Sequence, residues 1–204
     1  MAPGLLLENV APLGYLLVSR VLAEVPGTEL LYYGVDRLPA FCPTYGPIRE
    51  FFGEPPEQDP IVAAAIDEWH AIADEPYFTR ITPDYEQALR LMSILGQRAP
   101  LEMVFCELAW GPGQEKWLSR FRPFFGQPQN ATLFYGYDVA WRECTESAIT
   151  EWACAAEQKG IWAGRLNRWG LLNTYADALE LWRAVTRPDL AEEFQIFRVH
   201  RVGP

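Results

Sequence analysis

The two histidines are the first residues to consider for chemistry, because imidazole acts as acid, base and metal ligand near neutral pH. His70 has Asp67 three residues before it and Asp74 four residues after it, so a helix would place all three on one face. A metal site needs three or four converging ligands, and carboxylates beside one histidine are common on helix surfaces. We therefore predict no metal site. His200 lies among arginines and could pair with a carboxylate, although we interpret it as a polar residue at the end of a strand.

Nucleophilic catalysis has little support in the sequence. There is no G-x-S-x-G elbow, and no cysteine stands in a C-x-x-C pair or a recognisable nucleophile motif. We expect reduced, mostly buried thiols at Cys42, Cys106, Cys144 and Cys154.

A pair of carboxylates is the strongest indication of an enzyme. Asp138 follows an aromatic run, and a buried Asp138 near Glu107 or an arginine could act as a tuned acid or base. The alternative is a structural aspartate that accepts hydrogen bonds from a loop or a helix N-terminus. No glycine-rich dinucleotide motif is present, and the stretch 110–116 (WGPGQEK) lacks the phosphate-loop spacing, so we predict no cofactor.

The composition indicates a chain that can fill a core. Of its 204 residues, 50% are hydrophobic and 14% aromatic, and the net charge is −10. The negative charge argues against a nucleic-acid or membrane partner. The N-terminus lacks the charged region and cleavage pattern of a signal peptide, and no apolar run is long enough to span a membrane. We therefore expect a cytoplasmic protein.

The acidic residues are concentrated in one stretch. Residues 50–75 contain eight acidic side chains and no lysine or arginine, and they overlap a proline-rich segment, 39–60, that carries several aromatic residues. This pattern is typical of a solvated face, or of an electrostatic surface for a basic protein. The second interpretation gives a candidate partner-binding surface of Tyr45, Phe51, Phe52, Glu54, Glu57, Asp59, Asp67 and Glu68.

Hydrophobic periodicity predicts alternating strands and helices. Strands are expected at 14–25, 29–35, 77–81, 101–110, 131–139 and 194–202. Helices are expected at 61–73, after a Thr82 N-cap with Pro83 in the first turn, at about 145–158, around Trp162 to Trp169, and after Asn173 or Thr174. No sequence repeat is evident, although the second half repeats the alternation of element types.

These elements predict an α+β fold, a mixed sheet with several packed amphipathic helices. We expect residues 1–204 to form a single compact domain, with a possible soft subdivision near 111–127.

Three short motifs in the second half resemble a group of small bacterial proteins. The motifs are Phe134-Tyr-Gly-Tyr-Asp-Val-Ala140, Arg165-Leu-Asn-Arg-Trp-Gly-Leu-Leu172 and Phe194-Gln-Ile-Phe-Arg-Val199. Their order resembles that of immunity proteins encoded beside polymorphic toxins, over residues 131–202. The chain departs from that pattern at Trp141, where an acidic residue is expected, and at Leu172, where an aromatic one is expected.

The resemblance implies a cytosolic protein that binds and neutralises a cognate toxin domain by occluding its active site, without catalysis. An acidic immunity protein would suit a basic toxin. Two alternatives remain open: a structural component of a bacterial assembly, and a small hydrolase or transferase that uses Asp138 and Glu107.

Overall fold

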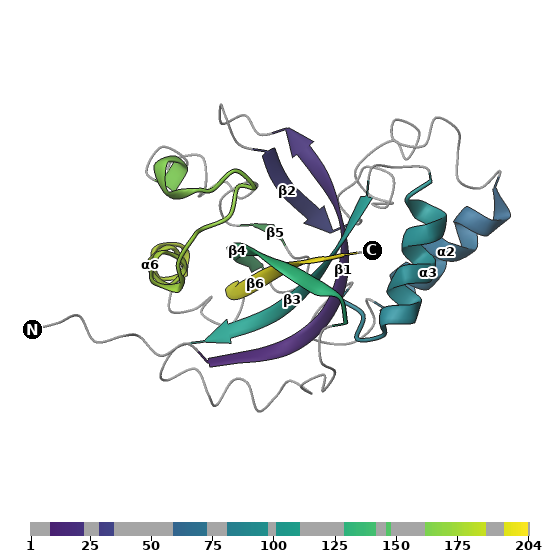
Figure 1. The fold of residues 1–204 in the computed structure, drawn as a ribbon, viewed down its shortest axis with the longest axis horizontal. Coiled ribbons are helices and arrows are strands. Elements are labelled where there is room, and N and C mark those ends of the chain that lie inside the picture. The colour runs from purple at the N-terminus through teal and green to yellow at the C-terminus, as the bar shows by residue number, and fades with distance from the viewer. Residues whose placement is uncertain are drawn as a thin grey trace, which may run out of the picture.

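Six strands form one sheet with the order β2-β1-β3-β6-β4-β5, and every described pairing is antiparallel (Figure 1). The computed structural model describes residues 9–22, 29–34, 59–72, 81–97, 101–110, 129–141, 146–147, 162–186 and 194–203. The strands are β1 (Asn9–Leu22), β2 (Glu29–Gly34), β3 (Leu101–Trp110), β4 (Ala131–Trp141), β5 (Glu146–Ser147) and β6 (Phe194–Val202).

Three helices and one short 3₁₀ helix accompany the sheet within the described ranges: α2 (Pro60–Ile72), α3 (Tyr85–Leu95), η3 (Ala163–Arg165) and α6 (Tyr175–Val185). Helix α3 packs against β1 and β3 and also contacts α2, whereas α6 packs against β4 and β6. The helical pair and α6 therefore flank the sheet at opposite ends (Figure 1). No described helix combines the length and apolar character needed to cross a membrane.

An antiparallel sheet with separate helices is an α+β arrangement, as predicted. The expected mixed sheet is wrong for the described strands, because each pairing is antiparallel. The strands β2 and β3, which the segment with α2 and α3 connects, run in the same direction, but β1 lies between them and pairs antiparallel with both. The proposed subdivision at 111–127 lies outside the described residues.

The sheet has an approximate twofold arrangement centred on β3 and β6. Each half contributes a central strand (β3 or β6), an inner strand (β1 or β4) and an outer strand (β2 or β5). The inner strands carry the same irregularity, a bulge between Pro12 and Gly14 in β1 and between Phe134 and Gly136 in β4. Each bulge ends at a glycine with positive φ, 150° at Gly14 and 147° at Gly136.

The tyrosine after each glycine makes the same contact. Tyr15 exchanges two backbone hydrogen bonds with Thr82, at 2.7 and 3.0 Å, and Tyr137 exchanges two with Leu172, both at 2.8 Å. A Cβ on Gly14 would overlap the Thr82 carbonyl, and one on Gly136 would lie 2.7 Å from the Leu172 carbonyl oxygen. Glycine is therefore required at both places, because the neighbouring segment lies where a side chain would stand.

The helices that follow these contacts also correspond. Helices α3 and α6 both have 11 residues and begin with a tyrosine, and they align without a gap as YEQALRLMSIL and YADALELWRAV. The first tyrosine packs on the strand tyrosine in both halves, Tyr85 on Tyr15 at 5.3 Å between ring centres and Tyr175 on Tyr137 at 6.1 Å. The described parts of residues 9–110 and 131–202 are thus two versions of one structural unit. The sequence analysis found no repeat, because few residues coincide.

One central row of backbone pairs marks the axis between the units. Gly14 pairs with Cys106, Cys106 with Val199, and Val199 with Gly136. Because opposed residues of an antiparallel pair project to the same side, the neighbouring rows occupy the other face. That other face, on which α3 and α6 pack, is called the helix face below.

Several local predictions need correction. The N-cap of α3 is Asp84 and not Thr82, because Tyr15 holds both backbone groups of Thr82 in an extended bridge. Residues 146–147 form β5, so a helix does not begin at 145, and the rest of that predicted helix lies outside the described residues.

Of the expected helix from Trp162 to Trp169, only Trp162 and the 3₁₀ turn η3 after it are helical, and a loop follows. The side chain of Asn167 donates to Tyr135 O at 2.7 Å and accepts from the backbone N–H groups of Trp169 and Leu171. These bonds replace helical ones. The helix capped by Thr174 and the strands at 101–110 and 194–202 are confirmed.

Candidate functional site

Three residues of the predicted partner-binding surface lie on described parts of the chain: Asp59, Asp67 and Glu68. The other five lie outside the described residues: Tyr45, Phe51, Phe52, Glu54 and Glu57. The structure therefore bears on the helical end of this surface, which α2 forms.

Asp59 starts α2. Its Oδ1 accepts hydrogen bonds from the backbone N–H groups of Ile61 at 3.1 Å and Val62 at 3.3 Å. Free N–H groups in the first helical turn need such an acceptor, and a carboxylate is also favoured by the helix dipole. Asp59 therefore helps α2 to form, independently of any contact with a partner protein.

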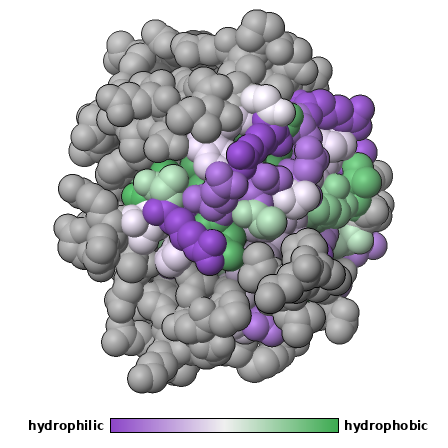
Figure 2. All heavy atoms as spheres, turned by 90° about the vertical axis from the view of Figure 1, so that its left-hand side faces the viewer, coloured by the Kyte–Doolittle hydropathy of each residue, from purple (hydrophilic) through white to green (hydrophobic). Residues whose placement is uncertain are grey.

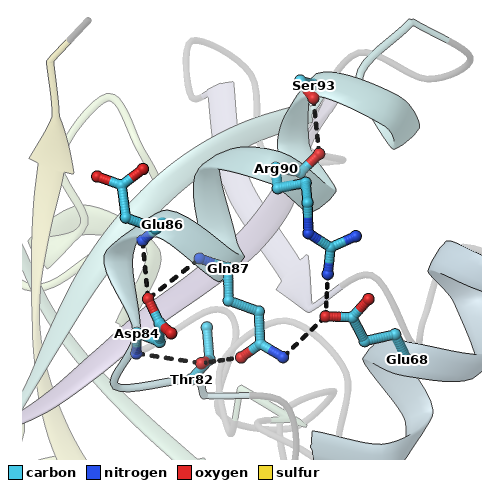
Figure 3. Close-up of polar contacts among 7 residues, drawn as sticks. All are labelled: Glu68, Thr82, Asp84, Glu86, Gln87, Arg90 and Ser93. Atoms are coloured by element: carbon cyan, nitrogen blue, oxygen red, sulfur yellow. Dashed lines mark hydrogen bonds and ion pairs between the residues drawn. The ribbon is translucent and has the colours of Figure 1, made fainter.

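Glu68 joins α2 to α3 (Figure 3). It accepts a hydrogen bond from Gln87 Nε2 at 3.0 Å and forms an ion pair with Arg90. Gln87 in turn accepts from the Thr82 hydroxyl at 2.6 Å. The hydrogen bond from Arg90, followed by that from Gln87, lowers the pKa of Glu68. The negative charge of Glu68 is therefore largely balanced by groups of the molecule itself.

The outward side of α2 combines apolar and acidic groups. Val62 and Ala65 are buried, whereas Pro60, Ile61 and Asp67 are exposed. Ile61 is 66% exposed, which is the largest exposed fraction among the large hydrophobic residues of the described ranges. Helix α2 therefore exposes one large apolar side chain and, six residues further on, one acidic side chain.

A second polar group lies at the centre of the helix face. Glu107 on β3 forms an ion pair with Arg198 at 3.1 Å and a hydrogen bond with His200 Nε2 at 2.7 Å, both through Oε2. The three side chains are 16%, 25% and 18% exposed. The hydrogen bond from His200 lowers the pKa of Glu107, and the nearby charges of His200 and Arg198 add to that effect.

Aromatic rings surround this group. The Phe134 ring lies 5.3 Å from the His200 ring and 5.1 Å from the Tyr137 ring, and the Arg198 guanidinium lies 5.4 Å from its centre. Phe134 is 37% exposed, so one part of the group reaches the surface. His200 and Arg198 therefore lie against an aromatic ring, where the interactions of their charges are less screened than in water.

Asp138 is separated from Glu107. It pairs with Phe197 in the row beyond the one that contains Glu107 and Arg198, so it lies on the opposite face of the sheet. Asp138 is 2% exposed and lines a cavity of about 30 Å³ together with Cys106 and apolar side chains. That space can hold water but is far smaller than a substrate pocket of a few hundred Å³.

Cys106 is an unreactive thiol in this position. Burial raises its pKa to about 12, and the carboxylates of Asp138 and Glu107 contribute further. Because the thiolate is the reactive form, Cys106 acts as a small buried side chain. Among the residues that the structure describes, no three histidine, cysteine or acidic side chains converge as a metal site would require.

Asp138, considered from the sequence as a partner of Glu107, is not in contact with it. From the sequence, His200 is interpreted as a polar residue at the end of a strand, whereas the structure joins Glu107 to His200 and Arg198. The signal that could have found this contact is the antiparallel pairing of the strands at 101–110 and 194–202.

The side of the molecule on which α6 lies shows a band of hydrophilic residues with smaller hydrophobic patches beside it (Figure 2). Glu180 and Arg183 are among the exposed residues of α6. Charges of both signs occur on this helix, in contrast to the exclusively acidic charge of the α2 sequence.

Comparison with known proteins gives no relative. No protein-family model, no curated protein and no solved structure matches this chain.

Two of the three sequence motifs, 134–140 and 165–172, meet at one place in the structure. Gly136 lies under Leu171 and Leu172, and Asn167 holds the same loop to β4. Gly170 adopts a φ of 74°, which a turn here requires. The motif residues therefore have a folding role in fixing the loop 166–172 on the sheet edge.

Proposed function

We propose that this chain is an immunity protein of the cytosol, which neutralises a basic cognate toxin domain without catalysis, by binding it and occluding its active site. The exposure of both Ile61 and Asp67 on α2, an apolar and an acidic side chain on one helix, is the observation that carries the proposal. The acidic stretch 50–75 and the net charge of −10 support a basic partner.

The contact would combine two physical effects. Fixed negative charge speeds the encounter with a positive surface and selects its orientation. Ile61 would supply an apolar anchor, because a desolvated side chain near the middle of an interface contributes much of the binding free energy. The aromatic residues Tyr45, Phe51 and Phe52 stay part of the predicted surface. A tight complex of this kind buries about 1,600 Å² in total.

The structure guides the choice of test variants. Asp59 and Glu68 are poor positions, because Asp59 caps α2 and Glu68 binds α3. Asp67→Lys and Ile61→Asp change exposed side chains of α2 instead. Glu86→Lys is the matched control, since Glu86 is an exposed acidic residue on α3 and points away from Glu68 (Figure 3).

The experiment uses the C-terminal domain of a secreted toxin encoded beside this chain. Surface plasmon resonance would measure association and dissociation, and co-expression would measure protection from the toxin. We expect Asp67→Lys to slow association about tenfold at low salt and Ile61→Asp to speed dissociation. Glu86→Lys should change neither rate by more than about twofold. The absence of binding and protection with the unmodified chain would contradict the function; equal rates for all variants would contradict only this surface.

A further inference from the structure

The two rows beside the twofold axis carry the clearest difference between the units. One row runs Pro12, Glu107, Arg198, Tyr137, and the other runs Tyr15, Phe105, His200, Phe134. The twofold arrangement makes Glu107 equivalent to His200 and Pro12 equivalent to Phe134. Each row keeps its tyrosine, which packs on a helix. At the equivalent positions next to the axis, one unit carries the acid Glu107 and the other the base His200, and these two side chains are in contact.

Glu107 fixes one nitrogen of His200 and leaves the other available. Its Oε2 lies 2.7 Å from Nε2, and Arg198 holds the same oxygen at 3.1 Å. Because a carboxylate only accepts, Nε2 carries the proton and neutral His200 has its lone pair on Nδ1. Among the described residues, the side-chain hydrogen bond of His200 is made through Nε2 and not through Nδ1. This is the arrangement by which a carboxylate prepares an imidazole to accept a proton.

Phe134 supplies a binding surface beside this nitrogen. Its ring lies 5.3 Å from the imidazole and is 37% exposed, so a flat apolar group could stack on it while a reacting atom meets His200. A half-buried ion pair adds little to stability compared with apolar side chains of similar size. A chemical role therefore explains why Glu107, Arg198 and His200 stand where apolar side chains could also fill the space.

We propose that His200 is a general base in the hydrolysis of esters that carry an aryl group, with Phe134 as the platform for the ring. This activity is separate from partner binding on α2. His200 Nδ1 takes a proton from water while the water oxygen bonds to the ester carbonyl carbon. The tetrahedral intermediate then breaks its bond to the aryl oxygen. The imidazolium returns the proton to that oxygen, so a carboxylic acid and a phenol are released.

The test measures hydrolysis of 4-nitrophenyl acetate by the full chain at pH 7.5. The chain has two histidines, so His70→Gln is a matched control for His200→Gln. We expect His200→Gln to lose about 100-fold of the protein-dependent kcat, the usual contribution of a general base, and His70→Gln to keep the full rate. The proposal is wrong if the unmodified chain is no faster than free imidazole at the same concentration, or if the two variants lose equal rates.

A second variant separates the platform from the base and avoids loss of folding. Phe134→Ala changes a partly exposed side chain, and circular dichroism would confirm that the variant is folded. We expect KM to rise about tenfold with kcat within about twofold, because stacking of the aryl ring is lost and the base is kept. An unchanged KM would overturn the assignment of Phe134. If His200→Gln does not fold, Glu107→Gln replaces it, and an unchanged kcat there would overturn the role of the pair.

Discussion

The two halves of the sheet use the same anchoring device with the charges reversed. In the N-terminal half, α3 presents Gln87 and Arg90 to the carboxylate of Glu68 on α2. In the C-terminal half, α6 presents two acidic residues at the corresponding helix positions to the guanidinium of Arg165. The unit needs a polar connection between its helix and the preceding segment, and either sign of charge provides one.

The distances in the second device are similar to those in ordinary ion pairs. Arg165 Nη1 lies 3.3 Å from Asp177 Oδ1 and 2.7 Å from Glu180 Oε2, and the guanidinium lies 4.6 Å from the centre of the Trp162 ring. The carboxylate of Glu180, followed by that of Asp177, raises the pKa of Arg165. By contrast, the bulge glycine and the tyrosine after it are identical in both halves. The two units can therefore differ in the sign of their exposed charges, whereas both need the same backbone contact at the glycine.

The largest predicted effect comes from the two glycines. Gly14→Ala and Gly136→Ala should each lower the free energy of unfolding by about 3 kcal/mol or more, because each Cβ meets a backbone carbonyl at a positive φ. Urea unfolding followed by circular dichroism measures this. Gly164→Ala is the control, since nothing lies within 4 Å of the added Cβ. A loss at Gly14 with none at Gly136 would show that the halves are not equivalent.

The second prediction concerns the pair that differs across the axis. Glu107→Gln should lower the free energy of unfolding by about 2 kcal/mol near pH 7, because Arg198 loses a half-buried counter-charge and His200 loses a charged hydrogen-bond acceptor. The lowered pKa of Glu107 means that its contribution is complete above the ordinary value of 4.5 and is lost as the pH falls through the folded value. Urea unfolding at pH 7 and pH 3 should show the variant approaching the unmodified chain at pH 3. An equal difference at both values would contradict this account.

Much of the fold followed from periodicity, whereas the axis group did not. The apolar run 101–110 and the stripe on 175–185 predict their elements directly, since each side chain's burial depends on near neighbours in sequence. The contact between Glu107 and His200 depends on the pairing of strands far apart in the chain. The repeat was hidden for a similar reason: its shared features are a bulge, a positive φ and a backbone bridge, and few side chains record them.

A smaller effect is expected at the helix caps. Asp84 accepts from the N–H groups of Glu86 and Gln87, whereas Thr174, the corresponding residue, accepts from one, that of Asp177. Replacing either cap by alanine should cost about 1 kcal/mol, with the larger loss at Asp84. Thermal unfolding of Asp84→Ser and Thr174→Ser, beside the alanine variants, would show whether the cap hydrogen bond is responsible. If the serine variants are no more stable than the alanine variants, the caps do not act in this way.

The smallest expected effect comes from making the N-terminal device resemble the C-terminal one. Arg90→Glu places a carboxylate opposite Glu68 and should lower the free energy of unfolding by about 0.5 kcal/mol, since both side chains are partly exposed. Adding Glu68→Arg restores opposite charges in the reversed order that α6 and Arg165 already use. The double variant should regain the lost stability in low salt, and the difference between the variants should shrink in 1 M NaCl. A double variant no more stable than Arg90→Glu would mean that Glu68 anchors α3 through Gln87 alone.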